Sequence, residues 1–247
     1  MLVTGSGRNI GRAIVLEFAR RGANVVINAR TNLDEARSVE AEARELGADV
    51  LIVMGEAADP AVVDEMRVKA EAKFGRVDMY VSNAARRPHK DFWDTTDEDW
   101  HYYLNQQLTA SWYLAKAFAP GMRQAGFGRI IHVNGPDGYS GGWNRVPHST
   151  AKGGLRALTK SLAAGLGQYG ITVNDINPGF TETIRDPETH PFLIGEQNRQ
   201  RVVSRIPIGR GTTPQELAFA CAFLCSVPAM CITGSIIHVD GGMSMLG

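Results

Sequence analysis

The feature that most constrains the fold is an alternation, along the whole chain, of short β-branched apolar runs with amphipathic stretches of helical period. Each run follows a glycine, the residue most often found just beyond the end of a helix. The runs are nearly continuous in apolar residues, which is typical of parallel strands covered on both faces. They lie at residues 25–27, 50–53, 77–81, 130–133, 171–173 and 236–239.

This alternation predicts an α/β fold, a doubly wound parallel sheet with helices on both faces. No linker, repeat or low-complexity segment interrupts the pattern, so we expect one domain over residues 1–247. Residues 1–3 begin the chain as an apolar run that is short for a central strand. We therefore expect that a few residues precede Met1 in the natural chain.

Composition excludes several classes of function. Lys plus Arg (26) balances Asp plus Glu (26), so we expect neither a nucleic-acid partner nor an anionic membrane surface. No apolar run approaches the roughly 18–20 residues that span a bilayer, and the N-terminus lacks the pattern of a signal peptide. Three cysteines cannot all pair within the chain, which indicates a reducing compartment and a cytoplasmic protein. They have no nearby metal-ligand set, so no metal site is expected.

A glycine-rich turn stands between the first apolar run and the first helical pattern. In that context such a turn is typical of dinucleotide binding, because glycines let the backbone approach the pyrophosphate and the helix N-terminus presents free N–H groups. The candidate cofactor residues here are Gly5, Ser6, Gly7, Arg8, Asn9, Ile10 and Gly11.

The end of the second strand indicates which nucleotide binds. A carboxylate there would hold the ribose 2′-hydroxyl of NAD(H), whereas an arginine accommodates the 2′-phosphate of NADP(H). This strand ends in Arg30, with no acid before Asp34, and Arg8 adds a second guanidinium. The pair favours NADP(H).

Taken together, these segments resemble the short-chain dehydrogenase/reductase family, close to its 3-oxoacyl-[acyl-carrier-protein] reductase type. The family's TGxxxGxG turn appears at 4–11 with Asn9 for the middle glycine, and its PGxxxT segment is intact at 178–183. The resemblance implies a Rossmann-type sheet of about seven strands and assigns the family's helix asparagine to Asn105. It also implies further cofactor contacts from Glu56, Ala57, Asn83, Ala84, Ala85, Pro178, Gly179, Thr181 and Thr183, with Thr183 holding the nicotinamide carboxamide.

The catalytic motif departs from that family. The family pattern is YxxxK, with a serine thirteen residues before the tyrosine. Here Lys152 is in place, but His148 stands at the tyrosine position and Gly135 at the serine position. In the family the tyrosine gives a proton to the carbonyl oxygen, while the lysine lowers the tyrosine pKa and holds the nicotinamide ribose.

An imidazole can take over that proton transfer near neutral pH. Its ordinary pKa is about 6.5, against about 10 for a phenol. A cation at Lys152 lowers the imidazole pKa further. Replacements for the lost serine donor are Asn134, Tyr139 and Ser140 on the loop that follows the fifth predicted strand.

Three functions remain open. The first is an NADP(H)-dependent oxidoreductase acting on a carbonyl or alcohol, with His148 as acid/base. The second is a family member that binds NADP(H) but catalyses imine reduction or a non-redox, lyase-type step. The third is a cofactor-binding partner protein without turnover. We expect substrate specificity in the loop 136–147 and in the segment 184–206, where residues 191–194 could form an apolar lid. The resemblance implies a homodimer or homotetramer.

Overall fold

The computed structural model describes residues 1–87, 89–184 and 195–246. Strands and helices alternate along the chain, as the apolar pattern predicts. The strands are β1 (Leu2–Val3), β2 (Val25–Ala29), β3 (Val50–Met54), β4 (Met79–Ser82), β5 (Gly128–Val133), β6 (Ile171–Pro178) and β7 (Ile236–Val239). The helices are α1 (Asn9–Arg20), α2 (Leu33–Glu45), α3 (Pro60–Phe74), α4 (Asp97–Leu104), α5 (Ala110–Ala125), α6 (Asp137–Ser140), α7 (Val146–Leu166), α8 (Glu196–Val203) and α9 (Pro214–Cys225).

All seven strands form one parallel sheet in the order β3-β2-β1-β4-β5-β6-β7. The predicted doubly wound Rossmann-type sheet is therefore confirmed. The strand order reverses between β1 and β4, and ligands of such sheets bind outside the carboxyl ends of the strands at this switch point. We therefore expect the catalytic residues and the nucleotide-binding residues at that edge of the sheet.

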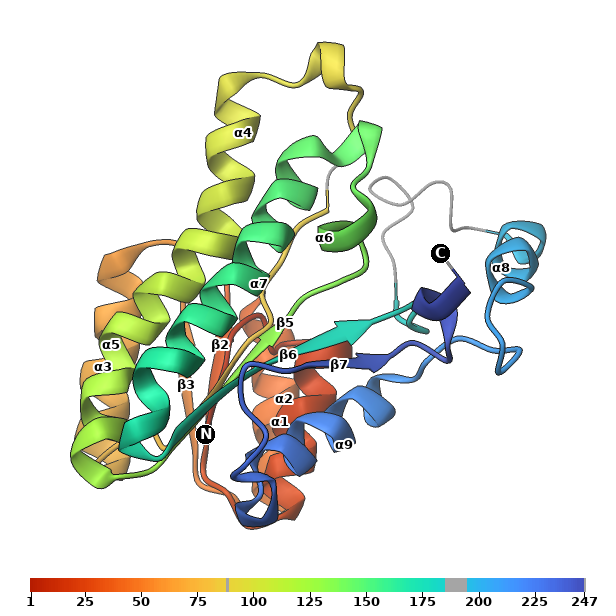
Figure 1. Ribbon diagram of the computed structural model, residues 1–247. Coiled ribbons are helices and arrows are strands. Elements are labelled where there is room, and N and C mark those ends of the chain that lie inside the picture. Colours follow the sequence, from red (N-terminus) through yellow and green to blue (C-terminus); the bar gives the residue numbers. More distant parts are fainter. Residues whose placement is uncertain (88, 185–194, 247) are drawn as a thin grey trace.

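Helices cover both faces of the sheet (Figure 1). One core lies between the sheet and α1, α2 and α9, with Ile14, Val39 and Leu217 buried in it. The other core lies beneath α3, α5 and α7 and contains Met66 and Leu114. Two covered faces explain why the strands read as continuous apolar runs. No helix of the described residues is long and apolar enough to cross a membrane.

Strand β6 runs five residues past its predicted end. The apolar pattern stops at Val173 because polar residues follow, yet Asn174, Asp175 and Asn177 are all buried. Their polar groups are paired: Thr159 Oγ1 donates to Asp175 Oδ1 at 2.7 Å, and Asn134 Nδ2 donates to Asp175 Oδ2 at 2.9 Å. A strand can bury polar side chains where each finds a partner, which hydropathy alone does not reveal.

His132 of β5 joins this buried network and should make the fold sensitive to acid. Its Nδ1 lies 2.7 Å from Thr159 Oγ1, and complete burial lowers the pKa of His132 to about 3. The unfolded chain protonates this histidine below about pH 6.5, whereas the folded chain does not. Folding stability should therefore fall by about 1.4 kcal/mol per pH unit, from this residue alone, as pH drops from about 6.5 towards 3.

Urea unfolding of wild type and His132→Gln at pH 7, 6, 5 and 4 measures this slope. Burial raises the pKa of neighbouring Asp175, so protonation of Asp175 increases folding stability as pH falls. Because Asp175 is present in both chains, this contribution does not account for a difference between them. We expect the variant to lose less stability between pH 6 and 4 than wild type, and His101→Gln, at an exposed position, to behave as wild type. Parallel slopes for all three chains would contradict the prediction.

Candidate active site

The glycine turn lies at the carboxyl end of β1 and leads into α1. Gly5 has a φ of +60°, and a Cβ on it would lie 2.9 Å from Ala84 Cα. A Cβ on Gly11 would lie 2.4 Å from the Gly5 carbonyl oxygen. Asn9, which replaces the middle glycine, has a φ of +52°, a conformation that asparagine tolerates better than most residues. The turn thus keeps the tight backbone path that a pyrophosphate site needs.

Side chains from neighbouring strands hold this turn in place. Asn83 Nδ2, beyond the end of β4, donates to the carbonyl oxygens of Thr4 and Gly5, both at 3.0 Å. The backbone N–H groups of Asn83 and Ala84 donate to Thr4 Oγ1. Buried Asn28 of β2 accepts from the Gly5 N–H, and the Ser6 hydroxyl donates to the Val3 carbonyl. The predicted residues at 5–11 and 83–84 therefore meet at the switch point.

Two arginines lie on this edge, one directly beyond β2 and one just before α1. Arg30, directly beyond β2, lies 3.9 Å from Glu56, and Arg8, just before α1, lies 3.8 Å from Glu35. Both separations exceed a hydrogen bond, and both guanidinium groups are largely exposed. Their donors are therefore available to an anionic ligand.

The segment beyond β6 approaches the same turn. Asn9 Nδ2 donates to the Ile184 carbonyl oxygen, and the Ile184 N–H donates to Asn9 Oδ1, each at 3.0 Å. This reciprocal pair brings Thr183, beside Ile184, to the glycine turn. A Cβ on Gly179 would lie 2.6 Å from Asp240 Cβ, so the strand end is closely packed. Among the other predicted cofactor residues, Ala57 and Thr181 are buried, Pro178 ends β6, and Ala85 is exposed.

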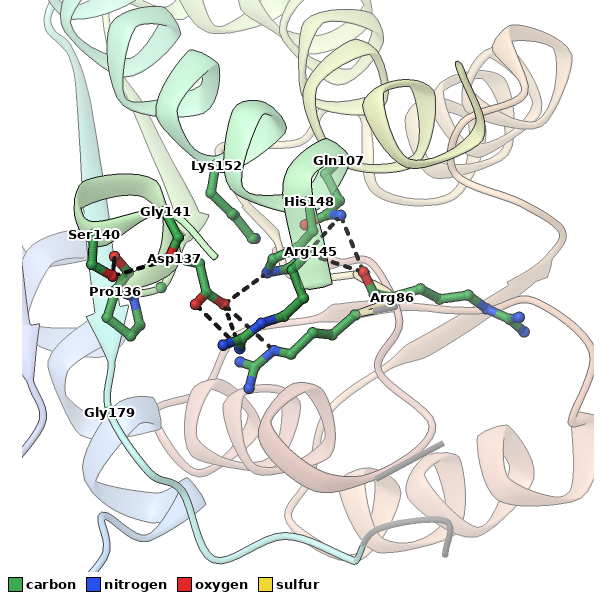
Figure 2. Close-up of polar contacts among 12 residues, drawn as sticks. Arg86, Gln107, Pro136, Asp137, Ser140, Gly141, Arg145, His148, Lys152 and Gly179 are labelled. Atoms are coloured by element: carbon green, nitrogen blue, oxygen red, sulfur yellow. Dashed lines mark hydrogen bonds and ion pairs between the residues drawn. The ribbon is translucent and has the colours of Figure 1, made fainter. Parts of the chain in front are cut away.

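At the other half of the edge, the start of α7 presents His148 to a buried carboxylate (Figure 2). His148 Nε2 lies 3.3 Å from Oδ2 of Asp137, the first residue of α6. The two side chains are only 3% and 7% exposed. The sequence search passed over Asp137. The sequence marks Asp137 only as an acidic residue two positions after Gly135, on the same loop as the candidate donors Asn134, Tyr139 and Ser140.

A second partner of His148 comes from the long helix after β4. Gln107 Nε2 lies 3.0 Å from His148 Nδ1 and donates to the Arg86 carbonyl oxygen at 3.1 Å. Gln107 belongs to a π-helical turn, Asn105–Thr109, between α4 and α5; such turns are frequent at functional sites. The predicted Asn105 is exposed and accepts from Thr109 Oγ1. The amide that faces His148 is therefore that of Gln107, which the sequence search missed.

The contacts of Nδ1 allow two tautomers of His148. Gln107 Nε2 can only donate to Nδ1, whereas the Arg86 carbonyl oxygen, 3.1 Å away, can only accept from it. With Nδ1 unprotonated, Nε2 carries the proton towards Asp137; with Nδ1 protonated, Nε2 has a free lone pair. Burial lowers the pKa of His148, and the charges of Lys152 and Arg87 act in the same direction. The Asp137 contact raises that pKa but does not compensate. The imidazole is therefore neutral at pH 7.

Asp137 remains a carboxylate although it is buried. Burial raises its pKa, but the bond to His148 and the charges of Arg87 and Arg145 lower the pKa by more. Arg145 Nη1 lies 3.2 Å from the carboxylate and Arg87 Nε lies 3.8 Å from it. Figure 2 shows the Arg145 guanidinium on the side of the carboxylate away from His148.

Lys152 lies one helical turn after His148 and is fully buried, which lowers its pKa to about 8. Its Nζ donates to the Val133 carbonyl oxygen, the last residue of β5, at 2.8 Å. The structure thus brings Lys152 and His148 together on one helix, as the spacing predicts. At pH 7 the lysine is mostly charged.

The three candidate replacements for the missing serine lie elsewhere. Asn134 donates to Asp175 in the core. Tyr139 stacks on Arg156, whose guanidinium carbon lies 3.2 Å from the centre of the Tyr139 ring. Ser140 donates to backbone carbonyls of its own turn. None of the three has a contact with His148. A Cβ on Gly135 would meet no atom within 4 Å, so open space lies where a serine side chain would project.

Of the two proposed specificity segments, the loop 136–147 includes Asp137 and Arg145 of this group. In the loop 136–147, Trp143 packs with Phe92 and Trp93 in an exposed aromatic cluster, with ring centres 5.1 and 6.1 Å away. Of the segment 184–206, the predicted lid at 191–194 lies outside the described residues.

Comparison with known proteins agrees with this geometry. Residues 5–244 match the profile of the family described as enoyl-(acyl carrier protein) reductase. The 3-oxoacyl-[acyl-carrier-protein] reductase FabG of Escherichia coli K12 is 36% identical over 99% of this chain and 97% of its own. The L-rhamnose 1-dehydrogenase (NAD(P)(+)) of Sphingomonas sp. SKA58 is 34% identical over 98% of this chain and 95% of its own.

Solved structures show the same fold over nearly the whole chain. The NADPH-dependent reductase YwfH, involved in bacilysin biosynthesis, superposes with a TM-score of 0.91 at 30% identity, covering 98% of this chain and 96% of that one. The fold and its glycine turn define an α/β protein of the dinucleotide-binding type, and the relatives named above are oxidoreductases. More narrowly, the chain belongs to the short-chain dehydrogenase/reductase family, as its motifs predict.

Proposed function

We propose that this protein is an NADP(H)-dependent oxidoreductase that interconverts a carbonyl compound and an alcohol, with His148 exchanging the proton. The observation that carries the proposal is the buried group of His148, Asp137 and Lys152 at the sheet edge that also holds the glycine turn. A neutral imidazole, a carboxylate and an ammonium side by side are suited to proton transfer near neutral pH.

The residues at this edge fit NADP(H). The close approach at Gly5 and Gly11 leaves no room for a side chain at either position, and the start of α1 offers free backbone N–H groups. Arg8 and Arg30 would hold a 2′-phosphate, and Thr183 would hold the nicotinamide amide. The bound cofactor supplies or accepts the hydride at the substrate carbon.

The protonation state of His148 gives the reaction a pH dependence. A neutral imidazole accepts a proton, so at pH 7 His148 serves as the base for alcohol oxidation. Carbonyl reduction requires the imidazolium, which becomes more abundant as pH falls towards the lowered pKa of His148. Oxidation should therefore be favoured above that pKa and reduction below it.

Substrate reaches His148 by exchange with Asp137. Both ring nitrogens are occupied, but the contact to Asp137 at 3.3 Å is long for a charge-assisted hydrogen bond. A substrate hydroxyl can take that place on Nε2 while Arg145 and Arg87 retain the carboxylate nearby. Nε2 accepts the substrate proton from the tautomer in which the ring proton is on Nδ1 and is donated to the Arg86 carbonyl oxygen, 3.1 Å away. Asp137 then stabilises the imidazolium that forms when His148 takes the proton, and Lys152 opposes it.

A turnover assay separates this proposal from a repurposed or non-catalytic family member. NADPH and NADH oxidation are followed with a panel of ketones and aldehydes, and cofactor binding is measured separately by fluorescence. We expect turnover with NADPH and a loss of the preference for NADPH over NADH in Arg30→Ala. Tight NADPH binding without turnover of any carbonyl or alcohol would overturn the proposed reaction.

We further propose that the protein assembles as a homodimer or homotetramer and acts on a small-molecule substrate. Trp112 of α5 is 46% exposed although it is a large apolar side chain. Such a residue is suited to a subunit interface.

A further inference from the structure

We propose that the substrate carries a carboxylate, or an anion of the same shape, which Arg87 and Arg145 bind beside the reacting carbonyl. This inference rests on the proposed function and names the substrate class of the same site. It concerns the part of the site around Asp137, which proton transfer alone does not explain.

Charge is the first reason. Four cations, Arg87, Arg145, Lys152 and Arg156, act on only two carboxylates, Asp137 and Asp175, in and beside this group. His148 adds no negative charge, because a neutral imidazole is its lowest charge state in water at ordinary pH. The group therefore carries an excess of positive charge, with Lys152 buried and Arg87 and Arg145 partly buried, and an uncompensated cation is costly in such a place. A substrate anion would compensate it.

Unused hydrogen-bond donors are the second reason. A guanidinium has five N–H groups in a planar fork that matches a carboxylate. Arg145 uses Nη1 for Asp137, while its buried Nε has no partner in the part of the chain that the structure describes. Arg87 lies 3.8 Å from Asp137, which exceeds a hydrogen bond. Both arginines therefore have donors left for an acceptor.

Position is the third reason. Asp137 links the two arginines to His148, since its carboxylate lies within 3.8 Å of all three. A carboxylate on the arginines and an oxygen on His148 Nε2 would belong to one small molecule. Arg86, next in the chain to Arg87, presents its backbone carbonyl to His148 while its side chain is exposed. Only Arg87 of this pair is therefore assigned to the anion.

Oxo acids and their methyl esters provide the test. Pyruvate, acetoacetate, levulinate and 5-oxohexanoate vary the spacing between carbonyl and carboxylate, and each ester keeps the carbonyl but removes the charge. With NADPH, we expect at least one acid to exceed its ester in kcat/KM by about 10- to 100-fold, as expected for hydrogen bonds to a charged group. Arg145→Gln and Arg87→Gln should each reduce that ratio towards one.

Matched controls separate substrate binding from other roles. Arg76 is an exposed arginine paired with Asp78, away from this site. The variant Arg76→Gln should retain the wild-type preference for the acid over its ester. The KM for NADPH should stay within about twofold in both site variants; a rise in that KM with an unchanged acid-to-ester ratio would assign the arginines to the cofactor and overturn the inference.

Calorimetry of the NADPH complex gives a readout that does not need turnover. We expect the preferred acid to bind wild type, its ester to bind at least tenfold more weakly, and Arg145→Gln to bind both alike. Arginine-dependent binding of an acid without reduction would support the inference while overturning the proposed reaction. Reduction of esters as fast as acids would overturn the inference and leave the reaction standing.

Discussion

Asp137→Asn is expected to lower kcat by about 10²- to 10⁴-fold, the usual contribution of general acid–base assistance. The amide keeps the shape of the side chain but removes the charge that stabilises a protonated His148. It also leaves Arg145 and Arg87 without their counter-ion. Steady-state kinetics of NADPH-linked turnover measure the loss, and the Kd for NADPH should stay within about twofold because Asp137 has no contact with the glycine turn.

Ser140→Ala is the matched control on the same short helix, since its hydroxyl contacts only backbone carbonyls of that turn (Figure 2). It should retain wild-type kcat. A purely structural role for Asp137 would lower kcat without moving the pH profile. If the Asp137 charge stabilises protonated His148, its removal lowers the pKa of His148. The acid limb of the pH profile for alcohol oxidation should then shift to lower pH in Asp137→Asn. Wild-type kcat in Asp137→Asn would rule out the His148–Asp137 pair as the catalytic unit.

The fold was accessible from sequence because hydropathy and glycine placement carry it directly. Strand β7 has the predicted bounds, and β2, β3 and β5 extend by one or two residues beyond them. Strand β6 shows the limit of the method. Asn174, Asp175 and Asn177 are buried by pairing with residues distant in sequence, and no local pattern records those partners.

The nucleotide half of the site was likewise predictable, because it consists mainly of backbone. A turn such as 4–11 needs small residues at set spacings, and those spacings are visible in the sequence. Asn83 and Thr4 come together because they follow the two strands that flank the switch point.

The proton-transfer half depended on side-chain directions that the sequence does not state. His148 and Lys152 followed from helical spacing. Asp137 lies where the chain enters α6, and the path of that loop decides which side chain points towards His148. The sequence analysis instead named Asn134, Tyr139 and Ser140 on this loop as candidate donors. Asn105 and Gln107 are amides two residues apart, and the π-helical turn between them determines which one reaches His148. Such turns are rare, and the sequence analysis did not predict one at 105–109.

Gly11→Ala is expected to weaken NADPH binding by about 100-fold or more. The new Cβ would lie 2.4 Å from the Gly5 carbonyl oxygen and 2.7 Å from Ser6 Cα, and both are backbone atoms that cannot rotate away. Relief requires the glycine turn to separate from α1, which removes the backbone path on which a pyrophosphate would lie. Fluorescence titration with NADPH measures the loss.

Gly7→Ala is the control within the same turn. Its Cβ would lie 3.3 Å from the side chain of Glu35, which is partly exposed and free to shift, and at an ordinary van der Waals distance of 3.6 Å from the Ala36 backbone nitrogen. We expect Gly7→Ala to bind NADPH within about fivefold of wild type, a difference of roughly 1 kcal/mol. Circular dichroism and the thermal midpoint show whether Gly11→Ala is folded at the assay temperature. A folded Gly11→Ala chain that binds NADPH as tightly as wild type would place the coenzyme site away from this turn, because no backbone cradle could survive that overlap unchanged.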